Sequence, residues 1–334
     1  MSKTARAAAV MDATGLGAAA RRIGAWRGLL VITHHRIGEP SRSRLDWDLW
    51  SARPEDFAAQ VRFLASNFEL VDPEALGPDL VRARGRRVLL TFDDGYRDNY
   101  EVAYRVLREH GARGVFFITT GFIDGRATAW WDEIAWLVRA SERREVAADG
   151  FLADPVAFDE PHRQGAVAAL RRTCASLPGD RVDAFLDWLA GATGAPRRGP
   201  ADSREDWMTW DMVREMRAGG MTVGAHTVTH PVLSSISLED QRTEVHESMA
   251  RLEQELGERP RLFSYPVGWR ASFTDATKAL VRDSGARLAF SNYGGFASRS
   301  NWDPYDIPRA NLGVDTEAAT FRAMTTIPQL FARW

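Results

Sequence analysis

The 334-residue sequence predicts an α/β protein built on a parallel sheet, which is either open or closed into a barrel. Three observations lead to this fold class. Short apolar runs of strand length recur along the chain, and helical patterns lie between most of them. One stretch of about 80 residues in the middle breaks this alternation, because it contains helical patterns but no convincing strand.

Seven segments are predicted to be strands, because each is short, rich in apolar and β-branched residues, and bounded by turn residues. Their separation by helical patterns favours parallel pairing, since parallel strands need a long crossover connection. In chain order the predicted strands are Leu29–Thr33, Arg87–Phe92, Gly114–Thr119, Met221–Ala225, Arg261–Tyr265, Ala286–Phe290 and Tyr305–Arg309.

The helices predicted between these strands carry start and stop signals. Pro54 suits a first helical position, and the apolar residues after it recur at helical spacing. A helix over Asn99–His110 is predicted to end at Gly111. A longer helix is bounded by Ser237, which resembles the first residue of a capping box, and by Gly257.

We expect two parts in the chain. Residues 1–28 form an N-terminal helical segment, and residues 29–334 form the α/β unit. Within that unit, residues from about 122 to 206 are predicted to be a helical insertion between the third and fourth strands. The insertion could cap a site, bind a partner or be a structural appendage. Its helix-like stretches are Asp132–Ala140, Arg163–Ser176 and Arg181–Ala190.

The charge balance argues against a nucleic acid partner. The 43 basic residues are offset by 45 acidic ones, which gives a net charge of -2. No basic field is therefore available to hold a nucleic acid backbone. A single cysteine, Cys174, excludes an internal disulfide bond and fits a reducing compartment.

The sequence also bears on location. No apolar run approaches the roughly 18 residues of a membrane span, so we expect no transmembrane segment. The N-terminus lacks the apolar core of an export signal, so a cytoplasmic address is expected. Its Arg/Ala bias leaves an organellar presequence open. Peripheral contact at the inner membrane surface, through Arg21, Arg22 and Arg27 beside Trp26, is a further alternative.

Polar side chains stand at the C-terminal ends of five predicted strands, where barrels and open α/β sheets build active sites. These positions are His34–His35, Asp93–Asp94, His226 with His230, Tyr265–Pro266 and Arg309. Each motif alone is compatible with a turn or with structural histidines. Together, one aspartate and two histidines form an open three-ligand set, typical of hydrolytic metal centres. The i, i+4 histidines could reach one ion if their segment turns helically.

These motifs resemble those of the polysaccharide deacetylase family, the NodB-homology carbohydrate esterases (carbohydrate esterase family 4-like). TFDDG at Thr91–Gly95 and HTVTH at His226–His230 are similar to the first two family motifs. FSYPVGW at Phe263–Trp269 is similar to the third motif, and THHRIG at Thr33–Gly38 resembles a YHR stretch of some members. The resemblance covers Leu29–Arg309 apart from the insertion. It implies a distorted (β/α) barrel with about seven parallel strands.

The resemblance also implies the roles of the polar residues. Asp94, His226 and His230 would bind one divalent metal ion, usually zinc (Zn2+), with Co2+, Ni2+ or Mn2+ as alternatives. Asp93 would be the general base, taking a proton from the water that attacks the carbonyl carbon of an N-acetyl group. The oxyanion would be held by the metal and by a backbone N–H, which we assign to Val267.

The sequence departs from the family pattern in the third motif and near the C-terminus. Where the third motif often begins with an arginine that steadies the base, this chain has Ser264, and Arg309 is our candidate to replace that arginine. The C-terminal Leu-x-His motif, whose histidine donates the leaving-group proton, is absent, since no histidine follows His246. His35 is therefore our candidate for the acid or for a second polar anchor. A structural role for His35 is the alternative.

Aromatic residues are candidates for contact with a saccharide. Tyr265 and Trp269 of the third motif are predicted to line the substrate site. Trp269, Trp130 and Trp131 could stack on sugar rings, and packing in the core is the alternative. His34 is expected to point away from the site, because adjacent residues of an extended segment face opposite sides.

The leading hypothesis is a metal-dependent hydrolase, a carbohydrate N-deacetylase that removes an N-acetyl group from an amino sugar during glycan biosynthesis. Because no export signal is found, a lipid-linked, nucleotide-linked or oligosaccharide substrate fits better than a large extracellular polymer. One alternative is a hydrolase of another non-peptide C–N amide bond. The other is a catalytically weak carbohydrate-binding protein on the same fold. The sequence predicts no oligomeric state.

Overall fold

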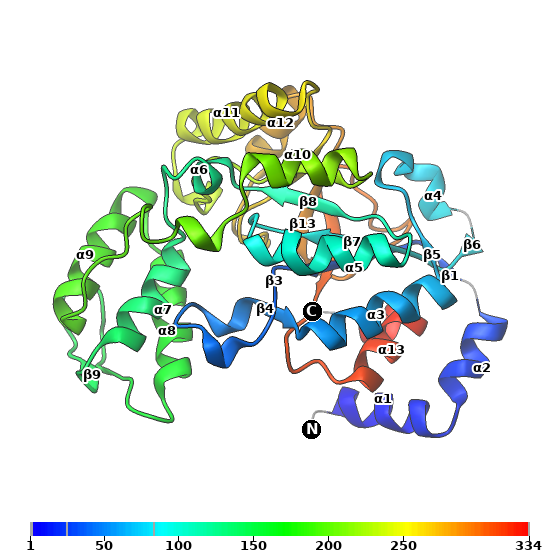
Figure 1. The fold of residues 1–334 in the computed structure, drawn as a ribbon, viewed down its shortest axis with the longest axis horizontal. Coiled ribbons are helices and arrows are strands. Elements are labelled where there is room, and N and C mark those ends of the chain that lie inside the picture. The colour runs from blue at the N-terminus through cyan, green and yellow to red at the C-terminus, as the bar shows by residue number, and fades with distance from the viewer. Residues whose placement is uncertain (1–2, 25, 83, 333–334) are drawn as a thin grey trace.

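The computed structural model describes residues 3–24, 26–82 and 84–332, and its centre is a closed barrel of seven parallel strands surrounded by helices (Figure 1). The prediction of an α/β fold on a parallel sheet is confirmed, and the sheet is closed rather than open, because β7 pairs with β2 over five residue pairs. In order around the barrel, the strands are β2 (Leu29–His34), β15 (Ile307–Asn311), β13 (Leu288–Gly294), β12 (Leu262–Ser264), β11 (Thr222–Ala225), β8 (Val115–Ile118) and β7 (Arg87–Phe92).

All seven predicted strands are present, and the last two differ most from their predicted ends. Strand β13 runs on to Gly294, and β15 begins at Ile307 and runs on to Asn311. Their pairing is irregular between Phe290 and Gly294, which local sequence patterns do not reveal. As a consequence, Arg309 lies within its strand instead of at the strand's end.

The strands form because their continuous apolar runs are buried on both faces, as expected where helices cover a parallel sheet. Alternate residues of β2 belong to different apolar clusters. Leu30 and Ile32 pack in the large cluster that includes residues of the surrounding helices. Leu29 and Val31 pack with alternate residues of the other strands, on the inner side of the barrel.

Most of the predicted helices surround the barrel at the expected places. Ser237 accepts a hydrogen bond from the N–H of Asp240 at 3.1 Å, and Gly257 has φ 74°, so both predicted ends of the long helix are confirmed. The helix predicted over Asn99–His110 is only partly right. Its first part, Asn99–Tyr104, is π-helical, and the α-helix α5 begins at Arg105. The surrounding helices are α3 (Pro54–Asn67), α5 (Arg105–Glu109), α10 (Trp210–Ala218), α11 (Leu238–Leu256), α12 (Asp275–Asp283) and α13 (Ala318–Thr326).

Three helices that follow β8 and precede β11 in the chain lie to one side of the barrel (Figure 1). They pack around an apolar cluster of their own. They are α7 (Trp130–Ala140), α8 (Arg163–Ala175) and α9 (Val182–Thr193). Phe158, Leu170 and Phe185 are fully buried within this cluster. The stretch also contains an antiparallel pair that the sequence did not predict, formed by β9 (Glu145–Val146) and β10 (Val156–Ala157), which are too short to give a pattern.

The N-terminal residues form two helices, α1 (Lys3–Ala13) and α2 (Leu16–Ile23), which pack against α13. Arg322 of α13 donates to Asp12 at 2.7 Å. In the described ranges, no helix is both long enough and apolar enough to cross a membrane. The remaining short elements are β1 (Trp26–Arg27), β3 (Arg36–Ile37), β4 (Trp50–Ala52), β5 (Glu69–Leu70), α4 (Pro78–Arg82), β6 (Arg84–Gly85), α6 (Thr120–Ile123), β14 (Phe296–Ala297) and α14 (Pro328–Phe331).

Candidate active site

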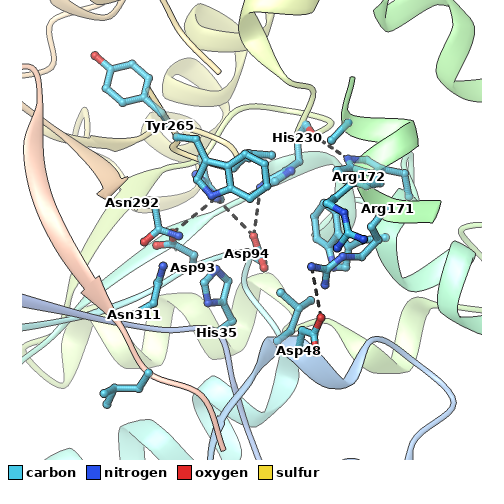
Figure 2. Close-up of a pocket in the computed structure, with 18 residues that line it drawn as sticks. His35, Asp48, Asp93, Asp94, Arg171, Arg172, His230, Tyr265, Asn292 and Asn311 are labelled. Carbon is cyan, nitrogen blue, oxygen red and sulfur yellow. Dashed lines mark hydrogen bonds and ion pairs between the residues drawn. The ribbon is translucent and has the colours of Figure 1, made fainter. Parts of the chain in front are cut away.

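A cavity of about 230 Å³ lies at the C-terminal ends of the barrel strands (Figure 2). The loops after β2, β7, β11 and β12 line it, together with the ends of β13 and β15. Every residue that the sequence singled out for the site lines this cavity except Arg309, which lies behind Asp93. Helix α8 contributes a further wall. The topology therefore brings residues from distant parts of the chain to one place.

Asp94, His226 and His230 form a compact group of potential metal ligands. Oδ1 of Asp94 lies 3.4 Å from Nε2 of His226 and 3.4 Å from Nε2 of His230. Two ligands of a tetrahedral zinc ion at about 2.0–2.1 Å would be roughly 3.3 Å apart, so this spacing suits such an ion. Oδ1 of Asp94 is buried, and no hydrogen-bond donor for it exists in the described chain. A cation would stabilise a buried carboxylate oxygen of this kind, so the group fits a divalent metal ion.

The two imidazoles have different surroundings. Nδ1 of His226 lies 2.7 Å from the carbonyl oxygen of Ser264, which favours the tautomer with a proton on Nδ1 and leaves Nε2 free to bind a metal. Burial opposes the charged form of His226, but Asp93 and Asp94 outweigh burial and raise its pKa. Burial and the neighbouring His226 lower the pKa of His230 to about 3. His230 is therefore neutral at physiological pH, as a metal ligand must be.

The segment His226–His230 is not helical, so the helical turn considered for it is not what brings the two histidines together. It is an irregular loop in which Thr227 and His230 have positive φ angles of 66° and 60°. The N–H of His230 donates to Oγ1 of Thr227 at 3.1 Å. This local turn, instead of helical periodicity, brings both imidazoles to Asp94.

Two neighbouring helices hold the histidine loop in place. Glu244 of α11 accepts hydrogen bonds from the N–H groups of Val228 and Thr229 at 2.8 and 2.9 Å, and from the Thr229 hydroxyl at 2.6 Å. On the other side, the N–H of Gly121 in α6 donates to the carbonyl of Val228 at 2.8 Å. A Cβ at Gly121 would lie 2.5 Å from that oxygen, so only glycine allows this close approach.

Asp93 is enclosed by Arg309. The guanidinium donates to Oδ1 at 2.8 Å and to Oδ2 at 2.7 Å, and both side chains are buried. The Ser264 hydroxyl also donates to Asp93, at 3.2 Å, and accepts from Arg309 at 2.8 Å. Burial opposes ionisation of Asp93, but the paired Arg309 and the nearby His226 outweigh it and hold the pKa of Asp93 well below its usual range. The carboxylate is therefore ionised and fixed in orientation.

Backbone strain is concentrated at this site. Among the residues that the structure describes, four besides glycine have positive φ angles: Asp94, Thr227, His230 and Val267, at 76°, 66°, 60° and 62°. Such conformations cost roughly 1–3 kcal/mol each and persist where the surrounding structure enforces them. Val267 is β-branched and lines the cavity. The described residues provide no hydrogen-bond acceptor for its N–H.

The aromatic residues are divided between the wall and the core. Trp131 packs edge-on to the ring of His230 at 4.4 Å and donates to the hydroxyl of Tyr96 at 2.8 Å, so it holds the histidine in position. Trp269 is 52% exposed at the cavity. Tyr265 points its ring away from Asp93 (Figure 2), stacks on Phe273 at 4.0 Å and donates to the carbonyl of Tyr305 at 2.9 Å. The Tyr265 side chain is therefore engaged in the core.

His34 and His35 face opposite sides, as the extended segment predicted. His34 is buried against Phe57 and Phe92, at ring distances of 5.2 and 5.1 Å, and burial lowers its pKa to about 4. His35 is partly exposed and lines the cavity below Asp94 (Figure 2). Its main-chain N–H is fixed by the hydroxyl of Ser51 at 2.9 Å.

Sequence reasoning did not find several residues of the site. Arg171 and Arg172 of α8 line the cavity, as do Asp48 and Asn311. Glu244 supports the histidine loop from behind. Only Asn311 carried a usable signal, because it follows the predicted last strand by two residues. The others reach the site through contacts between segments that are distant in the sequence.

Comparison with known proteins gives consistent matches. The family model described as "Polysaccharide deacetylase" matches residues 81–152 and 183–289, together more than half of the chain. A relative, the putative polysaccharide deacetylase YxkH of Bacillus subtilis (strain 168), is 18% identical over 299 residues, which cover 88% of this chain and 75% of that protein.

Two solved structures share the fold. The deacetylase PplD of Streptococcus pyogenes, solved in complex with acetate, superposes with a TM-score of 0.57 at 18% identity and covers 90% of this chain and 98% of its own. IcaB from Ammonifex degensii superposes with a TM-score of 0.54 at 19% identity, over 89% of this chain and 97% of its own. At these identities, the likeness establishes the architecture alone.

Proposed function

Because the chain belongs to the polysaccharide deacetylase family, and is thus a hydrolase of the carbohydrate N-deacetylase class, we propose that its cavity removes an N-acetyl group from an amino sugar of a saccharide with the help of a divalent metal ion. The observation that carries this proposal is the buried oxygen of Asp94, which lies 3.4 Å from the Nε2 atoms of both His226 and His230. When bound by these three residues, the ion supplies Lewis acidity, which lowers the pKa of a water and polarises the acyl carbonyl.

Residues of the chain carry out the proton transfers and bind the acyl oxygen. Asp93, held ionised by Arg309, accepts a proton from the attacking water. The N–H of Val267 donates to the acyl oxygen as that oxygen gains negative charge. His35, which lines the cavity beside Asp93 and Asp94 (Figure 2), donates a proton to the leaving amine nitrogen. Arg309 acts through Asp93 and is a positioning residue.

The exposed ring of Trp269 offers an apolar face for a sugar ring at the cavity. We propose a lipid-linked, nucleotide-linked or oligosaccharide substrate. We retain zinc as the first metal to test, with cobalt, nickel and manganese after it.

Metal content tests the proposal directly. We expect about one divalent ion per purified chain by elemental mass spectrometry, and its loss in His226→Ala. The matched control is His162→Ala, which removes an exposed histidine of the insertion that lies outside the cavity. A chain that holds no metal even after divalent ions are supplied would overturn the hydrolytic mechanism.

Acetate release tests the catalytic step. Asp93→Asn should retain the metal but release acetate roughly 10²–10⁴ times more slowly, because it lacks the proton acceptor. An Asp93→Asn variant as active as the wild type would contradict the role of the base. If the wild type binds saccharides and metal but releases no acetate from any of them, the carbohydrate-binding alternative is correct.

A further inference from the structure

We propose that the cavity contains an anion subsite at Arg172, so that the preferred substrate carries a phosphate or carboxylate group close to its N-acetylated sugar. This inference rests on the proposed deacetylase function and specifies its substrate class. The catalytic residues come from the barrel strands and their loops, whereas Arg172 comes from helix α8 of the insertion (Figure 2).

Arg172 differs from the other arginines at the cavity in having no acidic partner. Arg309 is bound to Asp93 through two hydrogen bonds. Arg171 forms ion pairs with Asp46 and, at 3.6 Å, with Asp48. For Arg172, the part of the chain that the structure describes contains no carboxylate within 4.0 Å. An arginine with a free guanidinium can bind a phosphate or carboxylate through two parallel hydrogen bonds.

The position of Arg172 is fixed by its neighbour. Arg171 ties α8 to the segment before β4 through Asp46 and Asp48. Gln164, two turns earlier on α8, adds a hydrogen bond to Asp48 at 2.8 Å. Because α8 is anchored at Gln164 and at Arg171, the backbone at Arg172 is held next to the cavity.

The remaining cavity is suited to a sugar next to the anion. Asn292 and Asn311 line the cavity, and their side-chain amides offer donors and acceptors for sugar hydroxyl groups. The carboxylate of Asp93 is neutralised by Arg309, and that of Asp94 is taken by the metal in the proposed function. Asp48, which also lines the cavity, shares Arg171 with Asp46. Arg172 is therefore the arginine at the cavity that no described carboxylate neutralises, and it can pair with an anionic ligand.

Arg172 lies in a part of the chain that the family model does not match. The family model matches residues 81–152 and 183–289, and the unmatched gap between them contains all of α8. The residues of the hydrolytic centre lie within the matched parts or at the barrel strands. In this proposal, α8 provides the selectivity for an anionic saccharide, and the barrel provides the residues for N-deacetylation.

Direct binding tests the subsite without relying on activity. The metal-loaded protein is titrated with N-acetylglucosamine and N-acetylglucosamine 1-phosphate by calorimetry, and comparison with Arg172→Gln, which keeps the metal ligands, separates binding by the arginine from binding by the ion. We expect the phosphorylated sugar to bind at least 10-fold tighter, and this ratio to fall about 10-fold or more in Arg172→Gln. Arg172→Lys should retain part of the ratio. Arg62→Gln, at an exposed arginine of α3 outside the cavity, should not change it.

Acetate release by the metal-loaded enzyme then shows whether the preferred substrate carries a phosphate or a carboxylate group. UDP-N-acetylglucosamine supplies a diphosphate, and a disaccharide of N-acetylglucosamine and glucuronate supplies a carboxylate. A preference for either over the neutral sugar that depends on Arg172 supports the subsite and names the anion. Equal use of all three by the wild type, with acetate released, overturns the subsite and leaves the deacetylase function standing. Arg172-dependent phosphate binding without acetate release from any of them overturns the deacetylase function only.

Discussion

Asp93 and Asp94 are adjacent in sequence, but the fold gives them separate environments. The left-handed conformation of Asp94, with φ 76°, turns its carboxylate toward the two histidines. Asp93 remains paired with Arg309. Two carboxylates that would repel each other in an extended segment therefore acquire different partners. The difference in partners is what lets one serve as a metal ligand and the other as a base.

At the same scale, Asp132 of α7 predicts a pH-dependent stability. Its buried carboxylate accepts from the N–H of Asp46 at 2.9 Å and from the hydroxyl of Tyr96 at 2.7 Å. Burial raises the pKa of Asp132 to about 7, from an ordinary value of 3.8. The folded chain thus holds a proton that the unfolded chain loses, and this stabilisation disappears as the pH rises through 7.

Because of this pKa shift, the unfolding free energy of the wild type should fall by about 2–3 kcal/mol between pH 5 and pH 8. In Asp132→Asn this part of the decrease should be absent. Urea unfolding of both proteins at the two pH values measures the difference. Asp180→Asn, which removes an exposed carboxyl group, should behave as the wild type does. Equal losses in wild type and Asp132→Asn would show that Asp132 is ionised in the folded protein at pH 5.

At the scale of the elements, the histidine loop depends on α11. Glu244 supplies the acceptors for two N–H groups and one hydroxyl of the loop. Glu244→Gln keeps the size of the side chain but loses the charge and one acceptor oxygen. We expect metal affinity to fall roughly 10-fold or more, because outer residues that orient ligands commonly contribute this much. Competition with a chromogenic chelator measures the affinity.

The matched control for this element is Glu247→Gln, which removes an exposed carboxylate from the same helix. Its metal affinity should equal that of the wild type. If Glu244→Gln also binds metal as tightly as the wild type, the loop is held by its own turn and by Gly121 instead.

Elements could be predicted from the sequence where burial alone determines them. The strand at Arg87–Phe92 is an example, because a short apolar run flanked by turns has few other structures available. The conformation of the histidine loop could not be predicted, because the loop is held by Glu244 and Gly121, which are distant in sequence. The π-helical turns at Asn99–Tyr104 could not be distinguished from an α-helix by the apolar periodicity of the sequence.

At the scale of the whole molecule, the barrel and the insertion have separate apolar cores. Phe185 is fully buried in the core of α7, α8 and α9, and Phe116 is buried in that of the barrel. Phe185→Ala should cost about 3–5 kcal/mol, as large-to-small core substitutions do. Hydrogen exchange should show faster opening of these three helices, while β7 and β11 remain protected and the metal is retained.

Phe116→Ala is the comparison for this prediction, because it should weaken the barrel strands as well. Uniform loss of protection in Phe185→Ala would mean that the two cores open as one cooperative unit. The domain boundary that we propose at about residues 122 and 206 would then have no energetic meaning.

The part of the candidate site that lies at the C-terminal ends of the strands could be predicted from the sequence. The positions of Asp93, Asp94 and His226 follow from parallel strands whose C-terminal ends meet. The placement of Arg309 against Asp93 could be suggested only as a replacement for a missing arginine. Arg171 and Arg172 could not be placed, because nothing in the sequence of α8 shows which way the insertion folds back onto the barrel.

The anchoring of α8 on the barrel has a consequence for evolution. The proposed hydrolytic residues and the proposed anion subsite are encoded in different stretches of the gene, joined in space by the ion pair of Arg171 with Asp46. Mutations within residues 153–182 can therefore be selected for a new acceptor while the chemistry of acyl removal is inherited unchanged. Duplicated copies of such a gene are expected to differ first in residues 153–182, where acceptor preference can change without loss of the metal ligands.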